Sequence, residues 1–189
     1  MLRKVLALSA VAVLAALPAA AQAPKAPAAK APAARAPAAK AVPKAAAPAF
    51  DARDPAALIA ILNGAGAKAQ AGQRVEDTVP VTVTSLAANF TVQFVGCNPQ
   101  GKACQATLYD YGPVQASPTL VQINGFNQSS ALCRAYQDKG GKPHVIYSAL
   151  VFPNMTRDQV VTQIAAWQGC LGDFSAFAKD PVGYLAVAP

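Results

Sequence analysis

The 189-residue chain has a formal net charge of +7, and the position of that charge decides what it means. Seven of the sixteen lysines and arginines lie before residue 51, and all nine aspartates and glutamates lie after residue 50, so nine cations and nine anions remain (9 − 9 = 0). A domain without net charge lacks the basic surface of a nucleic-acid-binding domain. No nucleic-acid partner is therefore expected.

Residues 1–21 have the pattern of a secretory signal peptide. Arg3 and Lys4 precede an apolar run over residues 5–17, and the small residues 19–21 offer a cleavage site. The run is shorter than the roughly 20 residues that a membrane-spanning helix needs. We therefore expect a periplasmic or secreted chain that begins at Gln22.

Residues 22–50 are almost entirely alanine, proline and basic residues in a near five-residue repeat. The prolines interrupt a helix before it propagates, and the like charges repel each other. We expect a disordered, extended spacer. It is either a solvated tether or a segment that contacts anionic envelope polymer.

Residues 51–189 are predicted to form one globular domain, which begins with a helix from Asp54-Pro55 to Asn63-Gly64. Between residues 72 and 112, threonine, valine and aromatic residues recur with period two, which predicts three antiparallel strands. Ser117-Pro118 is expected to begin a second helix through Phe126.

Two further strands are expected over residues 131–138 and 144–152, with a turn at Lys139-Gly140-Gly141-Lys142-Pro143 between them. Thr156 to Gln159 forms a capping box that predicts a final amphipathic helix. Its apolar stripe is Val160, Ile164, Trp167, Leu171, Phe174 and Ala178. The predicted fold is α+β, with an antiparallel sheet of about five strands in the order α-β-β-β-α-β-β-α.

The four cysteines, Cys97, Cys104, Cys133 and Cys170, allow three disulfide connectivities. Placing Cys97 opposite Cys104 also sets Val92 opposite Tyr109, and it separates an apolar face of the two strands from a polar one. Opposed residues lie within disulfide reach. We expect the pairs 97–104 and 133–170, with a zinc site or a redox pair as alternatives whose usual Cys spacings are absent.

The segment INGFNQSSALCRAYQD, with the later Trp167 and Phe174, resembles the YbjN-type family, whose members are described as bacterial sensory transduction regulators. Phe126 stands where the family pattern would have tryptophan. The residues that carry the likeness are Ile123, Asn124, Phe126, Asn127, Arg134, Ala135, Tyr136 and Asp138. The resemblance covers residues 55–178, and it implies a fold similar to type III secretion chaperones and a role in regulation or partner binding.

The resemblance makes five residues candidate binding residues for an unidentified protein or peptide: Phe126, Asn127, Arg134, Tyr136 and Trp167. A chaperone-like fold with exposed sheet edges also favours a homodimer.

No catalytic residue, metal site or cofactor is predicted. His144 is the single histidine, and no Gly-x-Ser-x-Gly elbow accompanies it. Glu76 and Asp77 are neighbours and are expected at a solvated strand end. We predict an exported, non-enzymatic binding or regulatory module. The alternatives are an envelope-attachment protein that uses the spacer, and a small hydrolase or thiol enzyme.

Overall fold

The computed structural model describes residues 49–112 and 114–188. The predicted signal peptide, and the predicted spacer apart from residues 49 and 50, lie outside the described residues. The structural statements below concern the described part of the chain.

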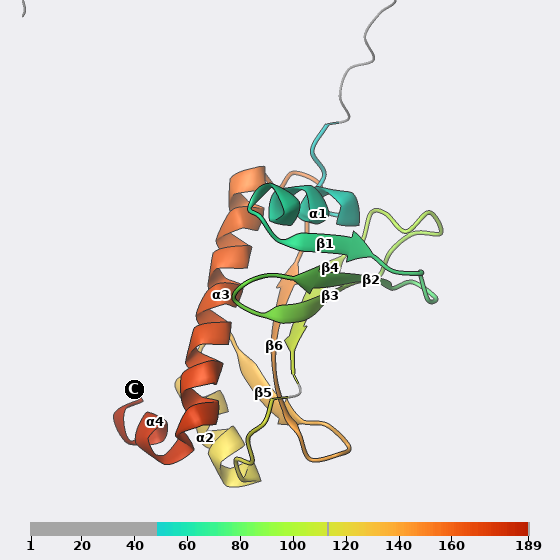
Figure 1. Cartoon of the computed structure of the whole chain (residues 1–189). Coiled ribbons are helices and arrows are strands. Elements are labelled where there is room, and N and C mark those ends of the chain that lie inside the picture. Colours follow the sequence, from blue (N-terminus) through green and yellow to red (C-terminus); the bar gives the residue numbers. More distant parts are fainter. Residues whose placement is uncertain (1–48, 113, 189) are drawn as a thin grey trace, which may run out of the picture. The chain divides into compact units, whose positions relative to one another are not determined.

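The described elements are α1 (Pro55–Gly64), β1 (Lys68–Ala71), β2 (Val79–Thr84), β3 (Asn89–Val95), β4 (Ala106–Tyr111), α2 (Leu120–Ser129), β5 (Arg134–Gln137), β6 (Pro143–Leu150), α3 (Arg157–Lys179) and α4 (Pro181–Val187). The strands form one antiparallel sheet in the order β1-β2-β3-β4-β6-β5 (Figure 1). The α+β class is therefore as predicted.

The helices cover one face of the sheet. The long helix α3 runs along the sheet, with α1 next to β1 at one end and α2 next to β5 at the other, and α4 packs against α2 and α3 (Figure 1). Alternate strand residues, such as Val83, Val92 and Tyr109, are buried together with helix residues in one core. The opposite, outward residues are only half-buried or exposed. We call this uncovered side the open sheet face.

The predicted register of β3 and β4 is confirmed. Val92 lies opposite Tyr109, and Thr91 lies opposite Asp110. Both expected disulfides are present, Cys97–Cys104 and Cys133–Cys170, with Cα–Cα distances of 3.8 and 5.6 Å. The alternation of apolar and polar residues was sufficient to predict the β3–β4 register. A slip of one residue would have turned every side chain of the strand to the other face.

The predicted element order omits β1 and α4, so the described sheet has six strands instead of about five. The sequence of β1, Lys-Ala-Gln-Ala, has no residue of high strand propensity. Its extended conformation comes from pairing with β2, where Ala69 lies opposite Val83. The short helix α4 begins with Asp180 and Pro181 as its N-cap and first residue.

The second helix begins two residues later than predicted. Thr119, not Ser117, is the N-cap, because its side chain and that of Gln122 form a capping box. Pro118 precedes the cap and is buried.

The buried side of α3 differs from the predicted apolar stripe. Val160, Trp167 and Phe174 are buried as expected, but Cys170 and Phe177 are buried with them. The predicted stripe members Ile164, Leu171 and Ala178 are only half-buried. The predicted stripe follows a strict seven-residue repeat, whereas contacts with neighbouring helices decide which flank of a helix is covered.

Candidate binding groove

A groove of about 550 Å³ lies between the end of α1, the β2–β3 turn and the stretch of α3 from Arg157 to Leu171. Val161, Ile164 and Leu171 contribute the α3 wall, and Leu86 and Phe90 lie on the opposite side. Leu86 is fully exposed at the tip of its turn, and Val161 is 44% exposed. We call this cavity the α3 groove. Apolar side chains that remain in water beside a cavity are typical of a binding surface.

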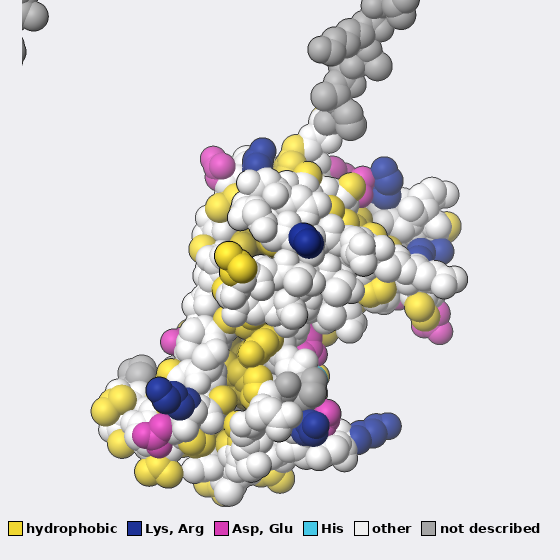
Figure 2. Space-filling model, in the orientation of Figure 1, with side chains coloured by type: hydrophobic (Ala, Val, Ile, Leu, Met, Phe, Trp, Pro, Cys, Tyr) yellow, Lys and Arg dark blue, Asp and Glu magenta, His cyan; other side chains and the backbone are white. Residues whose placement is uncertain are grey.

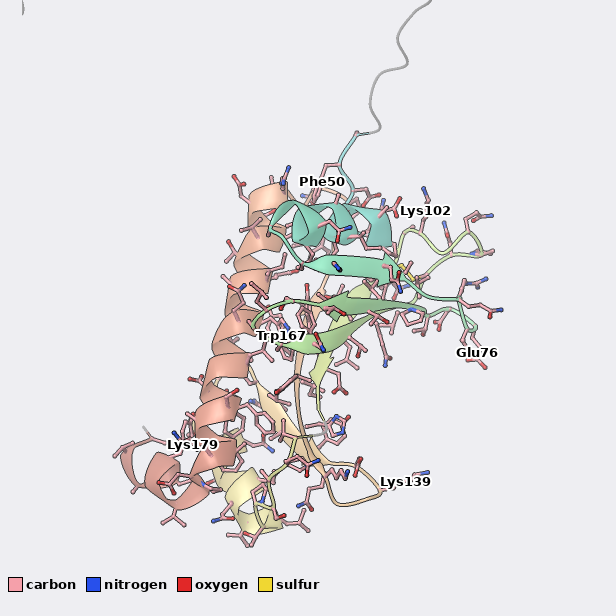
Figure 3. All side chains as sticks on the ribbon, in the orientation of Figure 1. Phe50, Glu76, Lys102, Lys139, Trp167 and Lys179 are labelled. Atoms are coloured by element: carbon pink, nitrogen blue, oxygen red, sulfur yellow. A yellow bond between two sulfur atoms is a disulfide. The ribbon has the colours of Figure 1, made fainter. Side chains whose placement is uncertain are left out.

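Trp167 forms the floor of the α3 groove. Its side chain lies between α3 and the sheet (Figure 3), where the ring packs edge-on against Phe90 at 5.5 Å between centroids and tilted against Tyr109 at 5.6 Å. The ring is 0% exposed, yet its indole N–H has no hydrogen-bond acceptor among the described residues. A buried donor without an acceptor is rare and costs free energy.

The polar side chains of the groove differ in their contacts. The charged residue that lines the groove is Arg157, the first residue of α3. It takes part in none of the ion pairs of the described residues. Gln168 lines the groove further along α3. Ser85 bonds within its own turn, donating to the carbonyl of Ala88 at 2.8 Å. The groove is therefore apolar with one cation at an end.

A polar cluster occupies the open sheet face at β4, β5 and β6. Asp110 accepts a hydrogen bond from the Tyr136 hydroxyl at 2.8 Å, and its other oxygen lies 2.9 Å from His144 Nδ1. The Tyr136 ring stacks on the imidazole at 4.9 Å. Burial, followed by the hydrogen bond to Asp110, raises the pKa of Tyr136 to about 12. We call these residues, with Asp138, the Asp110 cluster.

The remaining contact of the Asp110 cluster is with the β5–β6 turn. His144 Nε2 is buried and has no hydrogen-bond partner in the described residues, and Asp138 Oδ2 lies 3.7 Å away. Backbone N–H groups of Lys142 and Gly140 lower the pKa of Asp138, with a smaller effect from His144. Ser148 lies four residues from His144 on the same strand, about 13 Å at 3.3 Å per residue, beyond hydrogen-bond reach of the imidazole.

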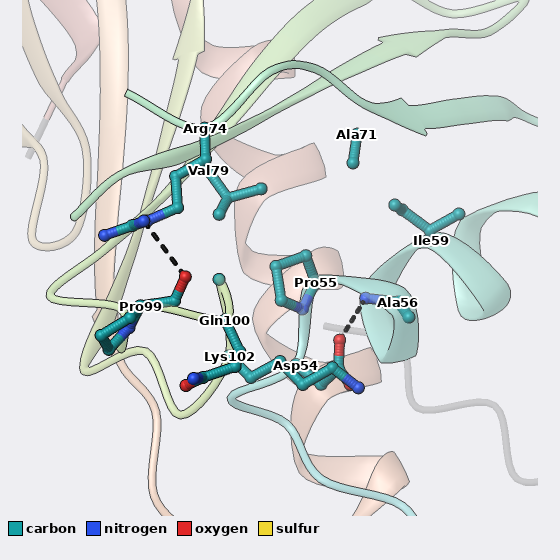
Figure 4. Close-up of a pocket in the computed structure, with 11 residues that line it drawn as sticks. Asp54, Pro55, Ala56, Ile59, Ala71, Arg74, Val79, Pro99, Gln100 and Lys102 are labelled. Carbon is teal, nitrogen blue, oxygen red and sulfur yellow. Dashed lines mark hydrogen bonds and ion pairs between the residues drawn. The ribbon is translucent and has the colours of Figure 1, made fainter. Parts of the chain in front are cut away.

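A second cavity of about 540 Å³ lies where the start of α1 meets the Cys97–Cys104 loop (Figure 4). Its charged side chains are already paired. Lys102 forms an ion pair with Asp54 at 2.9 Å, and Arg74 donates to the carbonyl of Pro99 at 3.1 Å. The first contact attaches the disulfide loop to the start of α1, and the second attaches it to the β1–β2 connection, so this cavity is a structural junction.

Exposed apolar side chains also gather on α2 and α4 (Figure 2). Leu120 and Val121 of α2, and Val182 and Val187 of α4, are 68 to 85% exposed. Neither of the two cavities above is lined by these residues. The patch therefore lies outside both cavities.

The five candidate binding residues do not meet on one surface. Phe126 is buried and packs against Phe174 and Phe177, and Trp167 is buried at the floor of the groove. Tyr136 belongs to the Asp110 cluster on the open sheet face.

Asn127 and Arg134 are used in local structure. The Asn127 amide accepts from the N–H of Ala135 at 2.7 Å and donates to its carbonyl at 3.0 Å. Arg134 Nη1 donates to the carbonyls of Ser130 and Cys133 at 2.8 and 2.7 Å. Both side chains thus stabilise the connection between α2 and β5.

Sequence reasoning missed Leu86, Arg157 and Val161 as groove residues. A signal was present for Leu86, since a leucine at the tip of a short turn is not covered by its own hairpin. Val161 directly follows the predicted stripe residue Val160. Which side of that stripe stays open depends on where α1 packs.

The described residues contain no group of three or more His, Cys, Asp or Glu side chains that could hold a metal ion. All four cysteines are in disulfides, so the thiolates that a zinc site would need are not available. Within residues 49–112 and 114–188, no helix is long and apolar enough to cross a membrane. No family model, curated protein or solved structure matches the chain.

Proposed function

We propose that residues 51–189 are an exported, non-enzymatic binding or regulatory module of the YbjN type, and that a protein or peptide partner binds in the α3 groove. The observation that carries this proposal is the groove itself, in which apolar side chains from three segments stay partly exposed around a buried tryptophan. Grooves of this size and composition are typical ligand sites.

The proposed location is the periplasm or the cell exterior. The N-terminal residues have the pattern of a signal peptide, and two disulfides are consistent with an oxidising compartment. Both disulfides lie in the domain that contains the groove, so that compartment also suits the folded binding site.

The second candidate is an envelope-attachment protein. Five cations lie among the alanines and prolines of residues 22–49, next to a domain without net charge. A polycationic segment would bind anionic wall or outer-membrane polymer by charge. In this case the spacer, and not the folded domain, would hold the protein at the cell envelope.

In-cell crosslinking of the tagged mature protein separates the two candidates. The full chain is compared with a variant that lacks residues 24–48, and products are identified by mass spectrometry under non-reducing conditions. We expect both forms to capture the same stoichiometric protein. Capture of envelope polymer alone, and only with the spacer present, would contradict the binding module and support attachment. Turnover of a defined substrate that is lost in His144→Ala would contradict both.

A further inference from the structure

We propose that the α3 groove binds an extended apolar peptide segment that ends in a carboxylate, with the carboxylate at Arg157 and a backbone carbonyl at the indole N–H of Trp167. This inference rests on the proposed function and specifies the partner's chemistry. Three features of the groove support it: its length, its charge and its buried donor.

The length of the groove suits a short peptide. Its α3 wall extends from Arg157 to Leu171. Fourteen residues at 1.5 Å each span about 21 Å along the helix axis. An extended peptide rises about 3.3 Å per residue, so six or seven residues fill that length.

The charge of the groove selects an anionic end. Arg157 is the one charged side chain among the residues that line the cavity in the described structure. Carboxylates form strong, often bidentate hydrogen bonds with arginine. The chain's own residues 22–49 carry five cations and no anion, so the spacer is a poor occupant of this groove.

The buried donor favours a peptide over a fatty acid, which would share the apolar body and the carboxylate. An acyl chain has no acceptor along its length, whereas a peptide offers a carbonyl at every residue. Among the described residues the Trp167 N–H has no acceptor, and the half-buried Phe90 ring, which also lines the groove, lies edge-on against the Trp167 ring. Because Trp167 is 0% exposed, binding in this mode requires neighbouring groove side chains such as Phe90 to shift, and the peptide carbonyl then satisfies the donor.

Trp167 is the only tryptophan of the chain, so its fluorescence reports on this site. Seven-residue peptides displayed with free C-termini are selected on the mature protein. The same selection is run on Val161→Glu, which places a charge on the exposed groove wall, and on Val182→Glu, a matched change on α4 outside the groove. Enriched sequences are synthesised as free acid and as amide, and titrated by Trp167 emission.

We expect apolar sequences to be enriched on the wild type and on Val182→Glu but not on Val161→Glu. The free acid should bind about tenfold more tightly than the amide, and Arg157→Gln should remove that difference. Enrichment that Val161→Glu does not change would overturn the groove as the site. Equal affinity of acid and amide would overturn the role of Arg157.

Two further outcomes separate this inference from the proposed function. If laurate shifts Trp167 emission and no peptide is enriched, the peptide is the wrong occupant. If no peptide binds while crosslinking still captures a partner on Val161→Glu, the inference fails. The proposed binding function then remains, but the partner binds on another surface. Loss of the captured partner in Val161→Glu, but not in Val182→Glu, supports both.

Discussion

Asp110 is the residue that organises the polar part of the open sheet face. Its two carboxylate oxygens contact two different elements, the Tyr136 hydroxyl on β5 and the His144 ring on β6. It therefore links three adjacent strands at the side-chain level. In the sequence these residues lie apart and do not indicate a cluster. Only the strand order β4-β6-β5 brings them together.

Tyr136 should ionise at about pH 12, and not at its ordinary value of 10. Folding raises this pKa, so the contribution to stability is complete below pH 10 and is lost as pH rises through about 12. The measurement is the tyrosinate absorbance of the wild type minus that of Tyr136→Phe. Asp110→Asn should lower the pKa, since it removes the carboxylate that accepts the phenol hydrogen bond. A difference titration centred at pH 10 would contradict the assigned environment.

Gly112 should not tolerate alanine, because an added Cβ would lie 2.5 Å from Cγ of His144 and its φ of 154° is unfavourable for other residues. We expect Gly112→Ala to lower the free energy of unfolding by about 1–3 kcal/mol in urea denaturation. Gly169→Ala is the control, since this exposed α3 glycine has nothing within 4 Å. It should stabilise by about 0.5–1 kcal/mol. A neutral Gly112→Ala would show that the His144 ring moves without cost.

At the scale of elements, both edges of the sheet are closed by an asparagine from the end of the preceding helix. Asn63 of α1 accepts from the N–H of Ala69 at 2.7 Å and donates to its carbonyl at 3.3 Å. Asn127 of α2 does the same for Ala135 on β5. Each amide thus replaces a neighbouring strand at that position, which protects an edge against pairing with another chain.

Asn127→Ala should destabilise the domain by about 1–3 kcal/mol, because the buried N–H and carbonyl of Ala135 lose their partners. The exposed edge should also increase self-association in sedimentation experiments. Asn124→Ala, an exposed change on the same helix, serves as control and should alter neither property. If Asn127→Ala keeps the stability and the association state of the wild type, the asparagine does not protect this edge.

For the whole molecule, the two disulfides act at different ranges. Cys97–Cys104 closes the loop between β3 and β4, whereas Cys133–Cys170 joins the segment before β5 to α3, and thus connects the sheet to the helical layer. On α3, Cys170 is next to Leu171, the last groove residue of the helix, and precedes Phe177, which packs against Tyr184 of α4. Loss of this bridge should weaken the packing of the helical layer on the sheet.

Replacing Cys133 and Cys170 with alanine should cost about 4 kcal/mol, against about 2.5 kcal/mol for Cys97 and Cys104. The separations of 37 and 7 residues set this order, because the longer loop restricts the unfolded chain more. Urea denaturation of the two double variants measures the difference. The reverse order would show that local packing around Cys97–Cys104 outweighs loop entropy.

The sequence by itself determined the features that depend on neighbouring residues. Capping residues at Asp54 and Thr156 marked helix starts, and period-two patterns gave the β3–β4 register and with it one disulfide. These signals are local because backbone hydrogen-bonding and side-chain alternation act over a few residues.

Only the tertiary structure decided β1, the closed sheet edges, the Asp110 cluster and the α3 groove. A weak strand such as Lys68–Ala71 forms because β2 and Asn63 supply its hydrogen bonds. The groove combines α1, the β2–β3 turn and α3, which lie up to about a hundred residues apart in the chain. Whether Val161 or Leu171 is buried or exposed depends on where those elements pack, and no local pattern encodes that position.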